Sequence, residues 1–558
     1  MDLRLEFWTR AWRGPLLAGA IACLAGLPGL IGMPVLDRDE ARFAQASAQM
    51  IESGDYVSID FQDELRAKKP VGIYWMQAAA VKALSGVEKR EIWAYRLPSL
   101  LGAMIAAAAC AWGAGAFFGG RRGFVAGAIL GATLILSTEA FIAKTDAMLC
   151  AAITLAMAAL GRIYAASKDG PPAGVGTRAL FWLGLALSIL LKGPIGPMIV
   201  GLTLGALWIF ERRLPWLKDI GWTWGVALVL FVVGPWALAI TVTTDGGFWT
   251  GAIGGDMLSK LSQAGQESHG APPGLHTLLT PVLLFPATLL LPVAAVAAWV
   301  HRDRPGVRFA LCWLIPSWIV FELSPTKLPH YTMPLYGALA WLIASAIADP
   351  MRRRDQITGA ILGMLVAGAL GVGVIYAARE YGGATAMTAA SVAGAFFAAA
   401  GIAGTVYLLQ RRPLHALAAA GVFGVLAHGV AAGVAAPWLT SLWVSRHTAE
   451  VLDKAGIDPR NGITPGPVAV VGYHEPSVVF SLGTETALTD AQGAADAIAE
   501  GRPAVVEAQF RQPFLDAVRA YGVTAAPVAE VRGLNYSKGD RVHLTLYRSL
   551  VTMPGDQP

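Results

Sequence analysis

The sequence predicts a polytopic α-helical membrane protein that ends in a small soluble α/β domain. Of the 558 residues, 55% are apolar and only 15% are charged, whereas soluble domains carry about 25% charged residues. About thirteen apolar runs are long enough to cross a bilayer, and the C-terminal part has an ordinary soluble composition. These observations exclude a cytosolic enzyme, a disordered chain and a secreted disulfide scaffold.

The apolar runs and the basic loops between them predict the topology. The runs are centred near residues 25, 106, 130, 155, 185, 202, 231, 288, 315, 341, 367, 396 and 425. Every second loop is basic, from Arg121-Arg122 to Arg411-Arg412, which is the pattern of cytoplasmic loops. We therefore expect an uncleaved first helix, a cytoplasmic N-terminus and an outer-face location for everything after Trp438. The net charge of +5 follows from these loops and does not indicate nucleic acid binding.

Two domains are predicted. Residues 1–437 form the transmembrane domain, and its long outer loop, 37–95, should hold helices lying along the interface, because the apolar piece 71–84 is too short to span. Residues 438–558 form the α/β domain. Its expected strands are at 468–471, 504–506 and 542–547, and its expected helices are at 488–500 and 512–521.

Charged and polar side chains gather at the predicted outer ends of the spans, where topology does not explain them. Charge near the hydrocarbon is costly, so such residues are candidates for function. They are Asp37, Arg38, Asp39, Glu40, Arg42, Arg66, Lys68, Lys69, Lys144, Asp146, Lys192, Asp256, Glu267, His269, Glu322, Lys327, His330 and Tyr331. Because distant loops deliver both carboxylates and cations to one face, we expect a single site that handles an anionic group.

Most of these candidates also have a structural interpretation. Helix capping suits Asp39 and Glu40, because acids favour a helix N-terminus. Lys192 is harder to explain in this way, because it lies in an apolar sequence beside a Gly-Pro break. Arg66, Lys68 and Lys69 could anchor lipid headgroups, and Asp146 could form a local ion pair with Lys144. His269 could be a solvated loop residue, and Tyr331 could belong to a belt of interfacial aromatics.

Several motifs, taken in order along the chain, carry a resemblance. They are Asp39-Glu40-Ala41-Arg42-Phe43-Ala44, Glu52-Ser53-Gly54-Asp55-Tyr56, Lys69-Pro70 with Tyr74-Trp75, Thr145-Asp146, Leu191-Lys192-Gly193-Pro194, and Ser324-Pro325-Thr326-Lys327-Leu328-Pro329 with Tyr331 and Pro334. Together they resemble the GT-C-fold glycosyltransferases that use polyprenyl-phosphate sugars. This superfamily includes the aminoarabinose transferases of lipid A and the protein O-mannosyltransferases. The resemblance implies a GT-C-like fold for the transmembrane domain.

The resemblance also implies roles for individual residues. Asp39 and Asp146 match the family's two acids and are the implied catalytic residues. The implied ligands of the donor phosphate are Arg42, Lys69 and Lys192. Substrate-binding roles are assigned to Glu40, Arg66, Lys68, His269 and Tyr331, of which His269 lies in a loosely matching loop.

One departure from the family pattern concerns the residues before Lys69. Relatives of the lipid A enzymes carry a glutamate directly before this lysine, where the present chain has Lys68. A metal site built on that glutamate is therefore not expected, and we predict neither a metal nor another cofactor. Arg66 replaces a tyrosine of the family pattern, which leaves open a different donor or acceptor head group.

The predicted function is transfer of a sugar from a polyprenyl (undecaprenyl) phosphate carrier, with inversion at the anomeric carbon. The expected location is a bacterial inner membrane, with the site and the C-terminal domain periplasmic. Lipid A or lipopolysaccharide is the leading acceptor, and a protein or another surface polysaccharide is the alternative. The rival function is a transporter or flippase for a polyprenyl-linked glycan. We expect a monomer whose partners are the donor, the acceptor and the bilayer.

Overall fold

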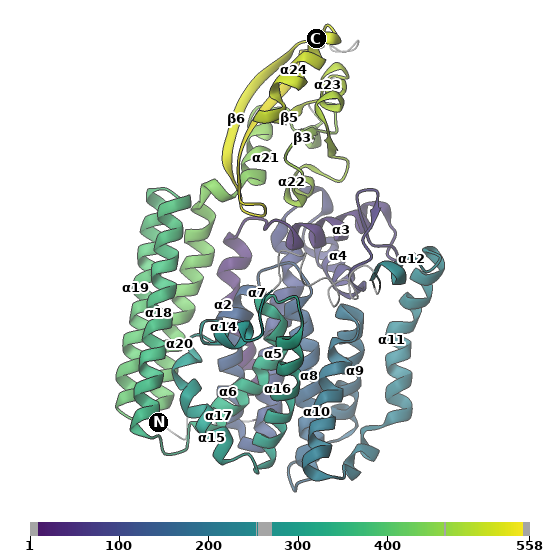
Figure 1. Ribbon diagram of the computed structural model, residues 1–558. Coiled ribbons are helices and arrows are strands. Elements are labelled where there is room, and N and C mark those ends of the chain that lie inside the picture. The colour runs from purple at the N-terminus through teal and green to yellow at the C-terminus, as the bar shows by residue number, and fades with distance from the viewer. Residues whose placement is uncertain (1–8, 10, 253, 255–270, 463–464, 551–558) are drawn as a thin grey trace.

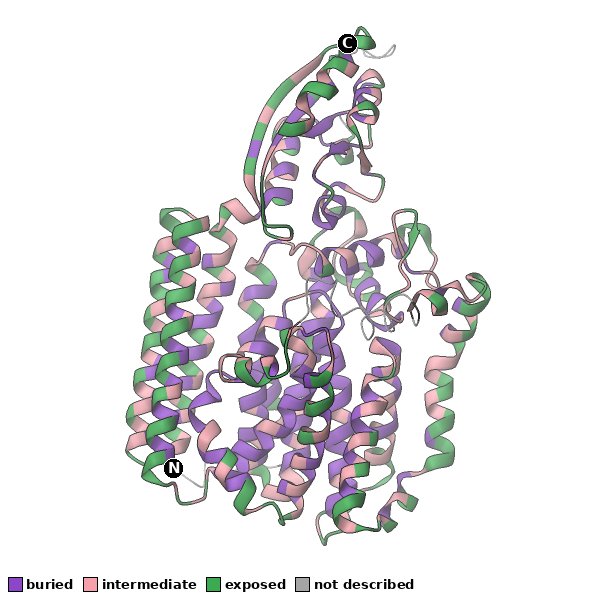
Figure 2. Ribbon diagram, viewed as in Figure 1, coloured by how far each residue is buried: buried purple, intermediate pink, exposed green. Residues whose placement is uncertain are grey.

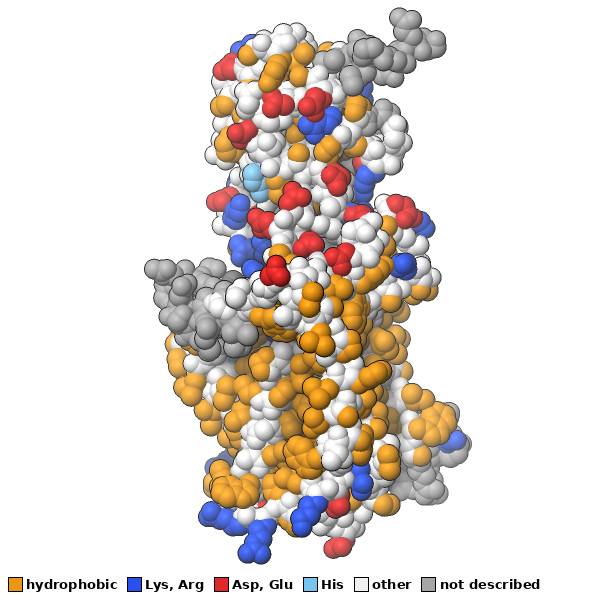
Figure 3. Space-filling view, turned by 90° about the vertical axis from the view of Figure 1, so that its right-hand side faces the viewer, with side chains coloured by type: hydrophobic (Ala, Val, Ile, Leu, Met, Phe, Trp, Pro, Cys, Tyr) orange, Lys and Arg blue, Asp and Glu red, His pale blue; other side chains and the backbone are white. Residues whose placement is uncertain are grey.

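The computed structural model describes residues 9, 11–252, 254, 271–462 and 465–550. A bundle of long helices forms the larger part, and a domain with a five-stranded sheet stands on one end of it (Figure 1). On the face that Figure 3 shows, hydrophobic side chains cover the helices, and Lys and Arg side chains lie below them, at the end away from the C-terminal domain. This is the distribution of a multi-pass membrane protein.

Nine helices of the described residues are long and apolar enough to cross a bilayer. They are α2 (Arg13–Gly32), α5 (Ile92–Phe118), α8 (Asp146–Ala166), α9 (Val175–Lys192), α11 (Trp222–Thr243), α16 (Pro305–Leu323), α18 (Arg353–Tyr381), α19 (Ala384–Leu409) and α20 (Pro413–Val430), which the turns η6 (Ala431–Ala435) and η7 (Ala436–Trp438) extend. A tenth candidate is a pair bent by 113°, formed by α14 (Leu275–Leu283) with η4 (Ala287–Leu290) and α15 (Leu291–Val300).

All thirteen predicted centres fall within helices, so the predicted positions are confirmed. The centres near residues 130, 202 and 341 lie in the shorter helices α6 (Gly120–Ala132), α10 (Ile195–Glu211) and α17 (Tyr336–Ala346). These helices have 13, 17 and 11 residues, which is fewer than the roughly 20 that a straight span needs. The count of thirteen spans therefore remains a prediction.

The long segment between α2 and α5 forms helices that are too short to span, as predicted. Its elements are α3 (Asp39–Ser53), β1 (Asp60–Phe61), β2 (Glu64–Leu65), α4 (Gly72–Leu84) and η1 (Val87–Lys89). Helix α3 ends at Ser53, and the next residue, Gly54, has a φ of +73°, a left-handed conformation that glycine adopts without strain. Shorter elements elsewhere are α7 (Leu134–Glu139), η2 (Pro215–Ile220), α12 (Gly247–Trp249) and η5 (Pro329–Leu335).

The C-terminal domain is a small α/β unit, as predicted. Its sheet has the order β4-β3-β5-β7-β6, in which β3 runs parallel to β4 and β5, and β7 runs antiparallel to β5 and β6. The strands are β3 (Ala469–Val471), β4 (Ala487–Thr489), β5 (Ala504–Glu507), β6 (Ala525–Asn535) and β7 (Asp540–Ser549). The helices and turns are η8 (Thr440–Leu442), α21 (Val444–Lys454), η9 (Pro459–Asn461), α22 (Pro476–Leu482), α23 (Ala491–Ala499), η10 (Ala508–Phe510) and α24 (Arg511–Ala520).

Side-chain alternation along the central strands explains how the helices cover both faces of this sheet. Val470 and Val505 pack into one apolar cluster with residues of α21 and α22, while Ala469 and Val471 pack into another with residues of α23 and α24. Two strands differ from the sequence prediction. Residues 488 and 489, predicted as the start of a helix, belong to strand β4. The edge strand β6 was not predicted, because its alternation is interrupted by Pro527 and by charges.

The C-terminal domain is docked on the segment that holds α3. The ring of Phe480 packs edge-on against Tyr95, with centroids 5.2 Å apart. Arg90 donates hydrogen bonds to Gln45 (2.7 Å) and to Thr484 of the domain (3.1 Å). Buried residues are concentrated in the middle of the bundle and along this junction, whereas α11, α18 and α19 expose much of their surface (Figure 2).

Candidate active site

A cavity of about 680 Å³ lies at the end of the bundle that carries the C-terminal domain. It is bounded by α3, the 61–69 loop, the start of α8, the end of α9 and η5. His474, Pro476 and Leu488 of the C-terminal domain contribute to its lining. Eight residues to which the sequence analysis assigned a role line it: Asp39, Arg42, Arg66, Lys68, Lys69, Asp146, Lys192 and Tyr331. The predicted gathering of carboxylates and cations at one face is therefore present.

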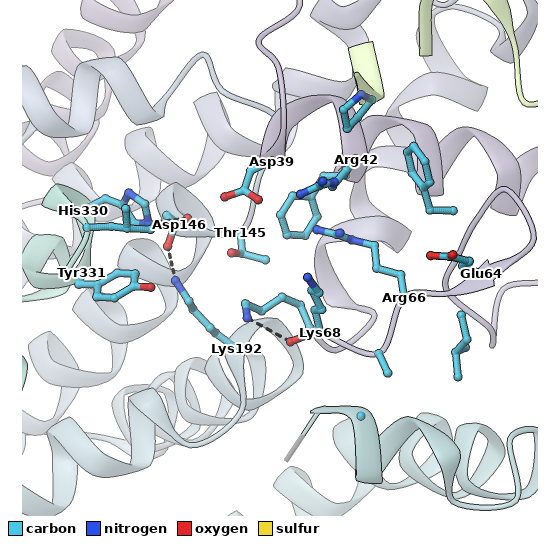
Figure 4. Close-up of a pocket in the computed structure, with 18 of the residues that line it drawn as sticks. Asp39, Arg42, Glu64, Arg66, Lys68, Thr145, Asp146, Lys192, His330 and Tyr331 are labelled. Atoms are coloured by element: carbon cyan, nitrogen blue, oxygen red, sulfur yellow. Dashed lines mark hydrogen bonds and ion pairs between the residues drawn. The ribbon is translucent and has the colours of Figure 1, made fainter. Parts of the chain in front are cut away.

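One wall of the cavity is built on two helix ends. Asp146 is the first residue of α8 and Lys192 is the last residue of α9, positions that favour an acid and a base because of the helix dipole. Helix α9 ends here because Gly193, with a φ of +61°, turns the chain before Pro194. The Lys192 Nζ lies 2.5 Å from the Asp146 Oδ1 (Figure 4), so the two termini are joined by an ion pair.

Buried charged groups behind this pair hold it in place. Lys144 lies 3.0 Å from the Glu139 carboxylate and 3.7 Å from that of Asp146. Burial holds the pKa of His330 well below its usual range, so the neutral ring accepts a hydrogen bond from the Lys144 ammonium group (3.3 Å) at Nδ1. We call Glu139, Lys144, Asp146, Lys192 and His330 the paired wall, because each member has a charged or hydrogen-bonding partner within it.

The opposite side of the cavity is more open. We call Asp39, Arg42, Arg66 and Lys68 the open wall; the Asp39 and Lys68 side chains are exposed to the cavity. Arg66 donates to the Tyr74 hydroxyl (3.2 Å) and lies 4.9 Å from the centroid of the Phe43 ring. Burial, and next the neighbouring Arg66, lower the pKa of Arg42. Asp39 and Arg42 lie between the Asp146–Lys192 pair and the side chains of Arg66 and Glu64 (Figure 4).

Glu40 does not line the cavity, which corrects its predicted substrate-binding role. Its side chain is completely buried and accepts two hydrogen bonds from Arg96, at 2.8 and 2.7 Å. It also accepts from the backbone amides of Leu36 (2.8 Å) and Ala143 (2.7 Å). Neighbouring residues of a helix point about 100° apart, so Asp39 faces the cavity while Glu40 faces the protein interior and holds the start of α3.

Other lining residues had no role in the sequence prediction. Thr145, Glu64 and His474 line the cavity, and His330 was a candidate without an assigned function. Thr145 and Glu64 could have been indicated by their closeness in sequence to Asp146 and Arg66. His474 reaches the cavity only because the C-terminal domain is docked there. His269 lies outside the described residues.

The lining residues are chemically suited to an anion. Arg42, Arg66, Lys68, Lys69 and Lys192 supply five cations to one cavity, and such side chains form charge-assisted hydrogen bonds with phosphate. Within the described ranges, no group of three or more His, Cys, Asp or Glu side chains is arranged to hold a metal ion. The expectation of a metal-free site remains a prediction.

Part of the chain is similar to known glycosyltransferases. Residues 68–238 match the family described as dolichyl-phosphate-mannose-protein mannosyltransferase. The undecaprenyl phosphate-alpha-4-amino-4-deoxy-L-arabinose arabinosyl transferase of Pseudomonas paraeruginosa is 29% identical over 326 residues, which cover 57% of each chain. A second such enzyme, from Pseudomonas fluorescens, is 28% identical over 62% of this chain and 61% of its own. The matched part thus spans less than two thirds of these relatives.

Solved structures with a similar fold match nearly the whole chain. ArnT from Cupriavidus metallidurans, in a crystal structure bound to undecaprenyl phosphate, has a TM-score of 0.74 at 20% identity, covering 95% of this chain and 97% of its own. The Archaeoglobus fulgidus oligosaccharyltransferase in its apo form has a TM-score of 0.51 at 11% identity, covering 94% of this chain and 70% of its own. The protein therefore has the GT-C fold of these structures, and part of its sequence is similar to membrane glycosyltransferases.

Proposed function

We propose that the protein is a monomeric glycosyltransferase that moves a sugar from a polyprenyl phosphate carrier to an acceptor at the periplasmic face of a bacterial inner membrane. The observation that carries the proposal is an exposed carboxylate, Asp39, in a cavity lined by five cations. The similarity to ArnT, whose structure holds undecaprenyl phosphate, supports this carrier. The basic side chains at the opposite end of the bundle support a cytoplasmic location for that end.

The cations suit the phosphate of the donor. Lys192 is held by Asp146, so it keeps its position when the cavity is empty, and Lys69 and Arg42 approach from other elements. In a site partly shielded from water, their positive field would stabilise the charge that develops on the phosphate as the sugar leaves. The leaving group then needs no proton.

Asp39 is better suited than Asp146 to act as a base. The carboxylate of Asp146 is only 7% exposed and is paired with Lys192, with Lys144 3.7 Å away, so it is poorly accessible to an acceptor hydroxyl. Asp39 is exposed to the cavity and can approach a hydroxyl of the acceptor. We therefore assign Asp146 to orienting Lys192, and Asp39 to catalysis.

The proposed step is a direct displacement. The acceptor oxygen forms a bond to the anomeric carbon while the bond from that carbon to the phosphate oxygen breaks, and the polyprenyl phosphate leaves with the bonding electrons. Asp39 takes the proton of the acceptor hydroxyl, and the configuration at the anomeric carbon inverts. If the acceptor is itself a phosphate, no proton is removed and Asp39 positions the reacting groups.

Lipid A or lipopolysaccharide is the proposed acceptor, as the motif resemblance to the lipid A enzymes implies. The names of the relatives support the donor side, an aminoarabinose carried on undecaprenyl phosphate. A protein or another surface polysaccharide would use the same displacement. Incubation of the purified protein with labelled polyprenyl-phosphate sugar and each acceptor class, followed by mass spectrometry of the product, distinguishes them.

The test of the donor assignment uses lipids that co-purify with the protein. Polyprenyl phosphate or its sugar conjugate should be present in the wild type, reduced in Lys69→Ala and unchanged in Lys454→Ala, an exposed lysine of the C-terminal domain. The sugar conjugate should accumulate in Asp39→Asn. If no polyprenyl lipid is found in any sample, the donor assignment is wrong. If glycan crosses vesicle membranes equally in the wild type and in Asp39→Asn, the protein is a flippase instead.

A further inference from the structure

The turn that leads into α3 is held on its inner side by Arg96. This buried guanidinium donates to the carbonyls of Met33 (2.5 Å) and Pro34 (2.8 Å) while it pairs with Glu40. The turn, residues 33–38, therefore has a fixed start, and Asp39 follows directly after it.

The same turn is held on its outer side by the C-terminal domain. The loop that joins β6 to β7 (residues 536–539) reaches down to the turn (Figure 1). The Tyr536 hydroxyl accepts a hydrogen bond from the Asp37 amide (2.7 Å), and the Arg38 guanidinium donates to the Ser537 carbonyl. The Tyr536 ring also packs edge-on against Trp443, with centroids 6.2 Å apart.

The conformation of Arg38 shows why these contacts matter. Its φ is +62° and its ψ is −103°, a region that side chains other than glycine rarely adopt without cost. The Arg38 carbonyl accepts the backbone hydrogen bond of Arg42 (3.0 Å). The backbone of Arg38 thus sets the direction in which both Asp39 and Arg42 leave the turn, and a conformation of this kind persists only when its surroundings hold it.

We propose that Tyr536, at the tip of the β6–β7 hairpin, is a positioning residue that holds the Asp37–Arg38 turn and thereby directs Asp39 into the cavity. Tyr536 acts through the backbone and does not line the cavity itself. The C-terminal domain then has two roles: it contributes residues to the cavity lining, and it holds the turn that places the Asp39 side chain. The inference rests on the proposed function only in naming Asp39 as the base.

Tyr536→Phe tests the inference, because it removes the hydroxyl and keeps the ring against Trp443. Loss of one hydrogen bond should speed hydrogen exchange at the Arg42 amide by about three- to tenfold and lower kcat by a similar factor. Donor affinity should fall by a smaller factor than kcat, because Arg42 follows the turn whereas Lys69 and Lys192 lie on other elements. The matched control is Tyr521→Phe, whose hydroxyl bonds to Asp496 on the far part of the same domain.

Arg38 provides a second, independent variant. Glycine adopts a positive φ freely, so Arg38→Gly should retain more turnover than Arg38→Ala, although both lose the contact with Ser537. If only the Arg38 side chain mattered, both variants would lose the same turnover. Equal losses in Arg38→Gly and Arg38→Ala would therefore overturn the inference.

The readouts separate this inference from the proposed function. Hydrogen exchange at Arg42 is measured on the resting protein, so it reports on the turn even if the wild type transfers no sugar. Faster exchange at an unchanged melting temperature supports the inference. Unchanged exchange and kcat in Tyr536→Phe overturn it, as does a loss of donor binding and melting temperature in parallel with kcat.

Discussion

The two walls of the cavity carry similar charges but hold them differently. In the paired wall, Asp146 and Lys192 are bound to each other, and their side chains are 7% and 17% exposed. In the open wall, the carboxylate of Asp39 and the ammonium group of Lys68 are exposed to the cavity. Side chains that are already paired lose little further entropy when a phosphate binds, so the paired wall is suited to phosphate binding. A base, by contrast, must remain accessible to the acceptor.

Asp39→Asn should have the largest effect on turnover, and it tests whether the open wall holds the base. Loss of the base should lower kcat by about 10²- to 10⁴-fold, with the melting temperature and donor binding unchanged, because the side chain is exposed. Transfer to a hydroxyl acceptor measures kcat, and Asp63→Asn, in the exposed turn between β1 and β2, is the control. A variant that keeps its turnover would show that the open wall does not hold the base.

Lys192→Ala should affect stability as well as donor binding. Removing one partner of a buried ion pair costs about 3 kcal/mol, at the low end of the usual range because Lys144 also lies near Asp146, 3.7 Å away. Thermal unfolding in detergent measures the loss. In the double variant with Asp146→Asn, part of the stability should return, since no unpaired carboxylate remains. Strictly additive losses would contradict the coupling of the paired wall.

Asp37→Asn tests a carboxylate just outside the open wall. Burial, with the nearby Glu475, raises the pKa of Asp37 to about 6. The folded protein therefore favours the protonated acid. As the pH rises from about 4 to about 6, the free energy of unfolding falls by at most about 3 kcal/mol, and the loss is complete above pH 6. Asp37→Asn should melt at a higher temperature than the wild type at pH 7.5. The difference should vanish at about pH 4, and parallel melting curves across this range would contradict the assignment.

Lys68→Ala should have the smallest effect. Its side chain is exposed at the cavity, so its attraction for the donor phosphate is screened by salt and is worth about 1 kcal/mol or less. Donor affinity should fall about two- to fivefold at low ionic strength and less at high ionic strength. An effect as large as that of Lys192→Ala, measured by titration of polyprenyl phosphate, would place Lys68 among the buried phosphate ligands.

The positions of the helices and most of the charged side chains that line the cavity could be predicted from the sequence. The length of the apolar runs and the basic loops between them indicated where the helices lie. The hydrocarbon favours long apolar stretches, and cytoplasmic loops are rich in Lys and Arg, so both features are visible in short stretches of sequence. Charges at the predicted outer ends of helices indicated Asp39, Asp146 and Lys192, because uncompensated charge beside the hydrocarbon is rare without a function.

Only the tertiary structure separated neighbouring residues with similar chemistry. Asp39 and Glu40 are adjacent acids, yet one is exposed to the cavity and the other is buried against Arg96, because helix geometry and the packing partner decide which way each side chain points. The contribution of His474 and the contact of Tyr536 with Asp37 depend on docking between segments more than 400 residues apart. Such contacts leave no local pattern, because they are determined by how the domains pack and not by the sequence beside each residue.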